Sequence, residues 1–295
     1  MAHPIIFDRR LLRIRRQRAA RLGPATFLLD ATAADMAERL SLVLRGFALA
    51  VDLGTPTEAV RQTLRGQVER LIAAEPFAAE RKAGLAIAAD EEALPFRDGS
   101  LDLVVSALAL HFVNDLPGTL VQIRRALRPD GLFLAALLGG ETLTELRQAF
   151  AAAESEIEGG VSPRIAPFAD LRDLGALLQR AGFALPVTDF ERLTVRYETV
   201  FALMQDLRRM GATNALTERR RTPLRRATLL RMAEIYAERF SDPDGRVRAT
   251  FDIVWLSGWA PDASQQKPLA PGSARMRLAD ALNTEELPAG EKAGE

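Results

Sequence analysis

The chain has 295 residues, with 39 basic and 39 acidic side chains, so its net charge does not favour nucleic acid as a partner. It contains no cysteine, which excludes disulfides, thiolate nucleophiles and cysteine-ligated metal sites. Hydrophobic residues make up 48% of the sequence, but no apolar run is long enough to predict a transmembrane helix. The length fits one large domain, or one domain with an insertion.

Residues 1–30 are rich in arginine, with leucine and isoleucine residues interspersed. Three interpretations stay open: a clamp for an anionic group, a targeting peptide, or a helix with a solvated basic face. The pattern from Asp30 to Phe47 then predicts a helix with Met36 and Leu40 on its apolar face. Residues 1–47 are therefore predicted to form an N-terminal helical cap.

Three short apolar segments predict the first strands of a sheet: Ala48–Leu53, Val68–Ala74 and Leu85–Ala88. Gly54 follows the first strand, where a nucleotide-binding sheet places its glycine loop. Glu75 follows the second strand roughly 20 residues later, the spacing of an acid that takes a ribose hydroxyl pair. The alternative for Glu75 is an acid at a helix N-terminus.

The next stretch predicts a strand–helix–strand unit. Leu101–Ala107 is a strand buried on both faces, Leu116–Leu127 has a helical apolar stripe, and Leu132–Leu138 is a second buried strand after a turn at Pro129–Gly131. Parallel sheets bind ligands at the carboxyl ends of their strands. Four polar residues are predicted to lie at that edge: Ser106, His111, Asn114 and Asp115. Asn114 or Asp115 could equally cap the following helix.

The second half of the chain predicts helices at Leu143–Ala153 and Leu171–Ala181. Val187–Tyr197 and Ala249–Trp259 alternate like strands and are predicted to pair antiparallel. Between them, Val200–Phe240 is helical and rich in arginine, with breaks predicted near a glycine and a proline, Gly211 and Pro223. From Pro261 onward a polar tail containing Pro268, Pro271 and Gly272 predicts loop or disorder.

Several motifs together give the chain a family resemblance. A strand ending D-L-G, an acid after the second strand, and Asp-Glu after the third resemble the class I S-adenosylmethionine (SAM)-dependent methyltransferases. LHFVNDLP, GGETLTELR, EGGVSPRIAPF and SQQKPLAPGSA narrow the resemblance to the complex I assembly factor 5 family of mitochondria and related bacteria. That family lies close to the malonyl-acyl carrier protein methyltransferases of biotin synthesis.

The resemblance implies an α/β fold with a Rossmann-like, mostly parallel seven-stranded sheet whose last two strands form an antiparallel hairpin. It implies a fold domain over residues 48–260, a helical insertion at 198–246 and a C-terminal tail at 261–295. SAM is the implied cofactor, and the implied contacts are Asp52, Gly54, Glu75 and Asp90, with Glu91 and Ser106 nearby. The implied partner is a complex I subunit or an acyl carrier protein, in the cytoplasm or peripheral to the inner membrane.

The chain departs from the family at the glycine loop. The family pattern is D-L-G-x-G-x-G, whereas Pro56 and Glu58 stand where the second and third glycines belong. Both side chains are predicted to crowd the methionine portion of SAM. Three functions therefore stay open: modification of a complex I subunit, methylation of a carrier protein or small molecule, and a non-catalytic assembly chaperone that has lost SAM.

The candidates for catalysis are few. The chain has two histidines, His3 and His111. His111 is a candidate general base or substrate-orienting group, and the alternative is a residue packed at a helix start. A conventional iron hydroxylase needs two histidines and a carboxylate, so no metal site is predicted. Methyl transfer mostly requires proximity and orientation, so it needs no strong catalytic residue.

Overall fold

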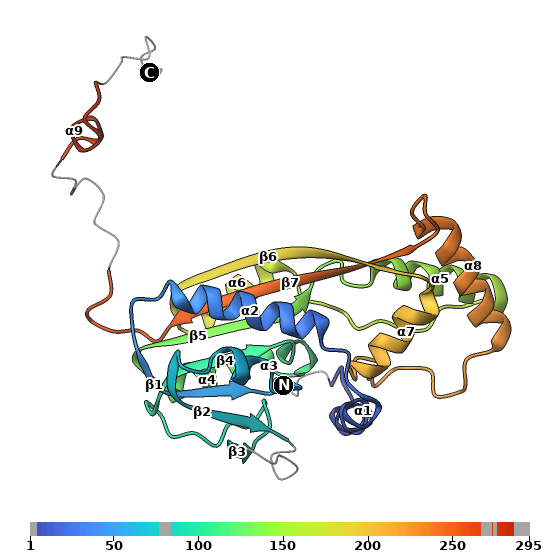
Figure 1. Cartoon of the computed structure of the whole chain (residues 1–295), viewed down its shortest axis with the longest axis horizontal. Helices are drawn as coiled ribbons and strands as arrows, with labels where there is room; N and C mark the ends of the chain where they lie inside the picture. The colour runs from blue at the N-terminus through green and yellow to red at the C-terminus, as the bar shows by residue number, and fades with distance from the viewer. Residues whose placement is uncertain (1–4, 77–83, 267–272, 274–275, 286–295) are drawn as a thin grey trace. The chain divides into compact units, whose positions relative to one another are not determined.

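The computed structural model describes residues 5–76, 84–266, 273 and 276–285, and these contain a seven-stranded sheet with helices on both faces (Figure 1). The strand order is β3-β2-β1-β4-β5-β7-β6, with β1 to β5 parallel and β7 antiparallel to both of its neighbours. The strands are β1 (Phe47–Leu53), β2 (Val68–Glu75), β3 (Leu85–Ala88), β4 (Leu101–Ala107), β5 (Leu127–Gly139), β6 (Ala184–Tyr197) and β7 (Val247–Trp259). The predicted fold class is confirmed, and the strand order reverses between β1 and β4, where such sheets bind ligands.

Alternate residues of β5 face two separate apolar cores. Leu132 and Leu134 pack with α2 and α5, whereas Phe133 and Ala135 pack with α4 and α6. The helices are α1 (Arg9–Leu22), α2 (Phe27–Ser41), α3 (Ala59–Thr63), α4 (Leu116–Ala126), α5 (Thr144–Glu158), α6 (Leu171–Arg180), α7 (Val200–Arg209) and α8 (Arg226–Phe240), with a 3-10 turn η2 (Leu110–Phe112). A central strand covered on both sides must be apolar along its whole length, and this explains the unbroken apolar run.

The last two strands form a long hairpin that carries the arginine-rich helices. β6 pairs with β7 from Ala184 opposite Trp259 to Tyr197 opposite Val247, and this confirms the predicted antiparallel pairing. Helices α7 and α8 connect the two strands, and α8 packs on α5 at one end of the hairpin (Figure 1). Helix α1 packs against α7, so two segments far apart in the sequence lie side by side.

Two predicted boundaries were wrong. The helix predicted from Asp30 to Phe47 spans Phe27–Ser41, because Phe47 already pairs with β2 as the first residue of β1. The turn predicted at Pro129–Gly131 lies inside β5. There Asp130 has a φ of 59°, its N–H donates to the Ala260 carbonyl at 3.0 Å, and the pairing with β4 shifts register between Leu127 and Leu132.

Residues Asp262–Glu295 form a unit separate from Met1–Pro261. Its described part contains a short helix, α9 (Leu278–Leu282), where the sequence predicted loop or disorder. Pro268, Pro271 and Gly272 lie outside the described residues. Over the part of the chain that the structure describes, no helix is both long enough and apolar enough to cross a membrane.

Candidate active site at the carboxyl ends of the strands

The ends of β1, β2 and β4 bring together three residues predicted to bind a cofactor. Gly54 follows β1, and its N–H donates to the Ala74 carbonyl of β2 at 2.8 Å, one residue before Glu75. On the other side of β1, the Ser106 hydroxyl of β4 donates to the Leu53 carbonyl at 2.7 Å. Gly54, Glu75 and Ser106 therefore share one edge of the sheet, as parallel strand directions require.

Two of the predicted cofactor residues, Ser106 and Asp52, have hydrogen-bond partners inside the protein. Ser106 is fully buried, and its hydroxyl donates to the β1 carbonyl. Asp52 is also buried, and its carboxylate accepts a hydrogen bond from Arg61 at 2.6 Å. Arg61 donates a second hydrogen bond, at 2.9 Å, to the carbonyl of Thr57. Ser106 and Asp52 thus form buried hydrogen bonds that hold the end of β1 and the loop after it.

Glu91 lies directly against Gly54. A Cβ atom at Gly54, where φ is +71°, would come within 2.6 Å of the Glu91 Oε1 atom. Only glycine fits there, because any side chain would displace this carboxylate. Glu91 is 1% exposed, so it fills the space over the single glycine that remains of the loop. By contrast, Pro56 and Glu58 are exposed.

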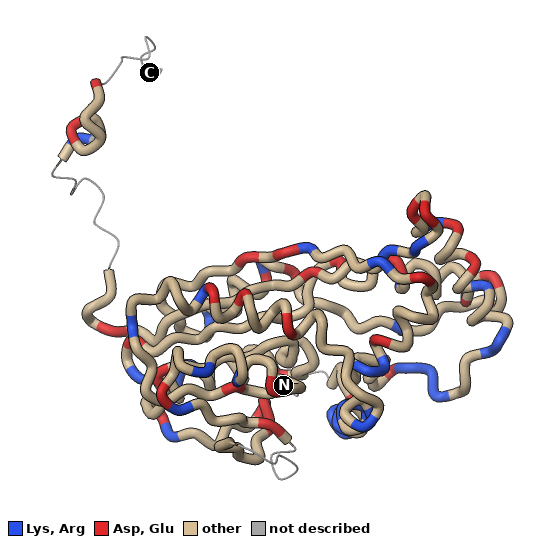
Figure 2. The backbone as a smooth tube through the Cα atoms, viewed as in Figure 1, with Lys and Arg blue, Asp and Glu red and all other residues tan. Residues whose placement is uncertain are grey.

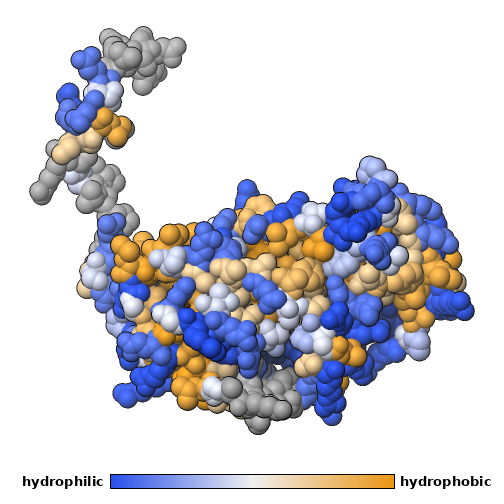
Figure 3. Space-filling model, in the orientation of Figure 1, coloured by the Kyte–Doolittle hydropathy of each residue, from blue (hydrophilic) through white to orange (hydrophobic). Residues whose placement is uncertain are grey.

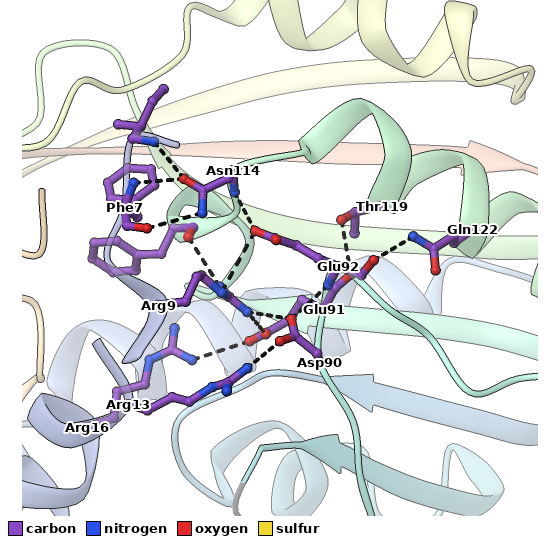
Figure 4. Close-up of polar contacts among 12 residues, drawn as sticks. Phe7, Arg9, Arg13, Arg16, Asp90, Glu91, Glu92, Asn114, Thr119 and Gln122 are labelled. Atoms are coloured by element: carbon purple, nitrogen blue, oxygen red, sulfur yellow. Dashed lines mark hydrogen bonds and ion pairs between the residues drawn. The ribbon is translucent and has the colours of Figure 1, made fainter. Parts of the chain in front are cut away.

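Three arginines of α1 form ion pairs with the acidic segment that follows β3, Asp90–Glu92 (Figure 4). Arg9, Arg13 and Arg16 are spaced four and three residues apart, so they share one face of the helix. Arg9 donates to Asp90 at 2.9 Å and also to Glu91. Arg13 pairs with Asp90, and Arg16 reaches Glu91 at 3.4 Å. We call Asp90, Glu91 and Glu92 the acidic edge.

Polar contacts also anchor the segment that leads into α1. The Asn114 Oδ1 atom accepts the N–H of Phe7 at 2.7 Å, and the Phe7 ring packs edge-on against Phe112 at 5.6 Å. Within α1 the buried residues are Leu12 and Ala19. Figure 2 shows how many residues along α1 are basic, and Figure 3 shows hydrophilic residues over much of this region on the face in view. Ion pairs therefore supply much of what holds α1 in place.

The charges of the acidic edge are stabilised by their partners. Burial alone would raise the pKa of Asp90, but the Glu92 N–H together with Arg9 and Arg13 outweighs burial and lowers it. Burial likewise opposes the charge of Arg9, yet Glu91 and Asp90 raise its pKa. Asp90 and Arg9 are therefore charged at neutral pH. Sequence reasoning missed this network, although the spacing of the three arginines was visible in it.

Asn114 and Asp115, predicted near the ligand, have structural contacts. Asp115 is the N-cap of α4, and its carboxylate accepts the N–H of Gly118 at 2.9 Å. Asn114 holds the chain at Phe7, before α1. The capping interpretation is therefore the one the structure supports for Asp115.

His111 lies in the 3-10 turn after β4, with an unusual environment. Its Nδ1 atom accepts the backbone N–H of Leu138 at 3.4 Å, so Nε2 carries the proton in the neutral ring. The Nε2 atom is buried, with no hydrogen-bond partner among the residues that the structure describes. Burial, and then the positive charge of Arg16, lowers the pKa of His111 to about 3. His111 is thus a neutral hydrogen-bond donor at physiological pH.

Two apolar cavities lie beside His111. The smaller, about 100 Å³, is bounded by α1, α2 and the loop after β1, with His111, Pro56 and Thr57 in its wall. The larger, about 230 Å³, lies among α5, α7 and β7. Neither is lined by Glu75, Asp90 or Ser106.

The residues that the resemblance assigns to SAM do not fit it as they stand. The Asp90 carboxylate, the candidate acceptor for the adenine amino group, is paired with Arg9 and Arg13. Glu91 covers Gly54, and the Ser106 hydroxyl is engaged inside the protein. We therefore derive no chemical step through SAM. Among the described residues, no three His, Asp or Glu side chains are arranged to hold a metal ion, and His3 lies outside them.

Comparisons with known proteins match this chain to one group of sequences along nearly its whole length. Arginine-hydroxylase NDUFAF5 of Danio rerio is 39% identical over 286 residues, which cover 93% of this chain and 89% of the relative. The Homo sapiens protein of that name is 40% identical over 286 residues, covering 93% and 83%. A malonyl-[acyl-carrier protein] O-methyltransferase of Laribacter hongkongensis is 40% identical over 212 residues, covering 72% and 66%.

The fold is shared more widely. A family model described as a methyltransferase domain matches residues 51–135. The structure of a proposed methyltransferase from Bacillus halodurans C-125 superposes with a TM-score of 0.53 at 14% identity, covering 78% of this chain and 99% of that one. The [4+2]-cyclase SpnF gives 0.50 at 15% identity, covering 88% and 98%. At such identities the likeness shows the fold alone.

Proposed function

The chain belongs to the arginine-hydroxylase NDUFAF5 family, within the methyltransferase superfamily of enzymes, and from that membership we propose that it modifies an arginine of a complex I subunit during assembly. The observation that carries the proposal is the length of the match: about 40% identity over 286 residues, most of both chains. The relatives' name indicates hydroxylation as the modification.

The acidic edge supports this proposal because it already binds guanidinium groups. Asp90 and Glu91 together hold the Arg9 guanidinium, and Asp90 also binds Arg13. Paired carboxylates match the planar fork of an arginine side chain. We assign recognition of the substrate arginine to Asp90 and Glu91, in competition with Arg9.

Hydroxylation of an arginine also requires an oxidant. It converts a C–H bond into C–O–H, which removes two electrons from the carbon. If dioxygen is the oxidant, one oxygen atom enters the arginine, an external donor supplies two electrons, and with two protons from solvent the other oxygen atom leaves as water. In this proposal the residues of the chain bind and orient the arginine, and a co-substrate supplies the oxidising power.

The test is deletion of the gene in its host, followed by mass spectrometry of arginine-containing peptides from complex I. We expect one arginine of complex I to carry an added oxygen atom in the wild type and to lack it in the deletion strain. Expression of the wild-type protein should restore the added oxygen. A double Asp90→Asn, Glu91→Gln variant should not restore it. Asp98→Asn is the matched control, because the Asp98 carboxylate pairs with Arg125 at the surface.

Other results would overturn the proposal in distinct ways. A requirement for biotin on deletion, with complex I arginines unchanged, favours the carrier-protein methyltransferase, to which the second group of relatives points. Failed complex I assembly with no arginine modified in the wild type favours the non-catalytic chaperone. Calorimetry with SAM separates the last two, since the chaperone would not bind it.

A further inference from the structure

The two apolar cavities adjoin each other. Both are lined by Phe112, Leu138, Met210 and Ala212. The larger cavity extends from these shared residues between α5 and α7, where its other lining residues are mostly aliphatic and aromatic. An apolar cavity, partly open to solvent, beside the carboxyl ends of the strands is a common place for a small ligand in an α/β fold.

Two polar side chains stand at the junction of the cavities. The His111 ring lies 4.2 Å from the Phe112 ring and 6.1 Å from that of Phe168, which lines the larger cavity. The Arg16 guanidinium carbon lies 5.9 Å from the same Phe112 ring. Both side chains also line the smaller cavity. A ligand that reaches Phe112 would therefore meet His111 and Arg16 together.

Each of these side chains has a buried N–H group without an acceptor among the described residues: Nε2 of His111 and Nη2 of Arg16. A buried donor left unpaired costs about 1–3 kcal/mol, so native proteins seldom leave two such donors in the lining of one cavity without a reason. A ligand oxygen that accepts from both donors would remove that cost. The missing group is thus an acceptor, not a donor.

The charged side chains that line the cavities indicate the charge of the ligand. Of the described residues that line the two cavities, the charged ones are all arginines: Arg16 and Arg209 in the smaller, Arg164 and Arg208 in the larger. This lining disfavours a cation, so the substrate arginine is not the occupant. A carboxylate suits both the unpaired donors and the positive lining.

We propose that the two cavities bind an aliphatic monocarboxylate, with its carboxylate at His111 and Arg16 and its chain in the larger cavity. A cavity of about 150 Å³ holds benzene, so 230 Å³ accommodates a chain of roughly nine carbons. This site differs from the acidic edge in charge and in lining, and the proposal does not depend on arginine modification.

Calorimetry of the full chain with straight-chain carboxylates, from butanoate to dodecanoate, tests the proposal. Burial of each added methylene should tighten binding roughly fourfold until the chain reaches about nine carbons, and then binding should level off. Decanol, which lacks the carboxylate, should bind at least about tenfold more weakly than decanoate. Equal binding of the two, or no dependence on chain length, would overturn the proposal.

Two pairs of variants locate the binding site. Arg16→Met should weaken decanoate about tenfold. Arg13 lies on the same helix face, pairs with Asp90 and lines neither cavity. Arg13→Met should therefore change decanoate binding by no more than about twofold. Ala212→Phe should fill the junction and abolish binding, whereas Ala263→Phe, at an exposed position, should not.

Thermal unfolding of each variant shows whether it is folded, and this keeps the outcome interpretable. If folded Arg16→Met and Arg13→Met proteins bind decanoate equally, the carboxylate does not lie at Arg16 and the proposal is wrong. These are binding measurements, so they succeed or fail independently of the arginine peptides that test the proposed function.

Discussion

The ion pairs between α1 and the acidic edge lead to a stability prediction for Arg9→Met. The Arg9 side chain is 14% exposed and that of Glu91 only 1%. Without Arg9, the buried Glu91 carboxylate keeps Arg16, at 3.4 Å, as its one remaining ion-pair partner in the described network. Breaking a buried pair costs about 3–5 kcal/mol, and the remaining arginine places this case near the lower end, at about 3 kcal/mol.

Thermal unfolding measures this loss. For a chain of this size class, about 3 kcal/mol corresponds to a fall in Tm of roughly 6–12 °C. Arg125→Met is the matched control, because Arg125 pairs with Asp98 at 3.0 Å while both side chains are more than half exposed. That pair should contribute about 0–1 kcal/mol. If Arg9→Met lowers the Tm no more than the control, the acidic edge does not hold α1 and the reasoning is refuted.

The same ion pairs predict a pH dependence. The pKa of Asp90 is lowered in the folded protein, so its contribution to stability is present above its unfolded pKa of about 3.9. That contribution is lost as the pH falls through the lower, folded pKa. The stability difference between wild type and Arg9→Met should therefore shrink on acidification. A difference that stays constant down to the acid-unfolded state would contradict the assignment.

Three further outcomes follow from single sites. His111, with a pKa of about 3, should show no titration by NMR between about pH 8 and 5, and a midpoint near 6.5 would contradict its burial. Gly139→Ala should cost about 1–3 kcal/mol in urea unfolding, because its Cβ would lie 2.4 Å from a β7 methyl group. Gly160→Ala, with nothing within 4 Å, should stay within about 0.5 kcal/mol. Ser106→Ala should cost about 1–3 kcal/mol by removing the donor to a buried strand carbonyl, and an unchanged Tm would argue against that bond.

Much of the sheet could be predicted because burial on both faces demands mostly apolar runs. Leu101–Ala107 is apolar except for Asp102 and Ser106, and each of its residues is buried in β4. The β6–β7 pairing could be predicted from alternation in the same way. The start of β5 could not, since Pro129 and Gly131 are turn residues by type. Hydrogen bonds of Asp130 and Gly131 with Ala260, which come from tertiary packing, hold that segment beside β7.

The site was harder to predict than the sheet. The positions of Gly54, Glu75 and Ser106 follow from the rule that parallel strands end at one edge. The partners of Asp90 do not, because Arg9 is 81 residues away in the sequence. Helical spacing shows that the α1 arginines share a face, but not which acids that face will meet. For that reason the sequence left the anionic clamp, the targeting peptide and the solvated basic face all open.

Arg16 links the two ligand preferences inferred from the structure. One of its nitrogen atoms contacts Glu91 at 3.4 Å, while another is buried without a partner and the side chain lines the smaller cavity. Its charge also helps to keep His111 neutral, as a donor. A guanidinium preference at the acidic edge and a carboxylate preference in the cavities therefore meet at one residue of α1. Arg16 thus contacts the acidic edge and the cavity wall with one side chain.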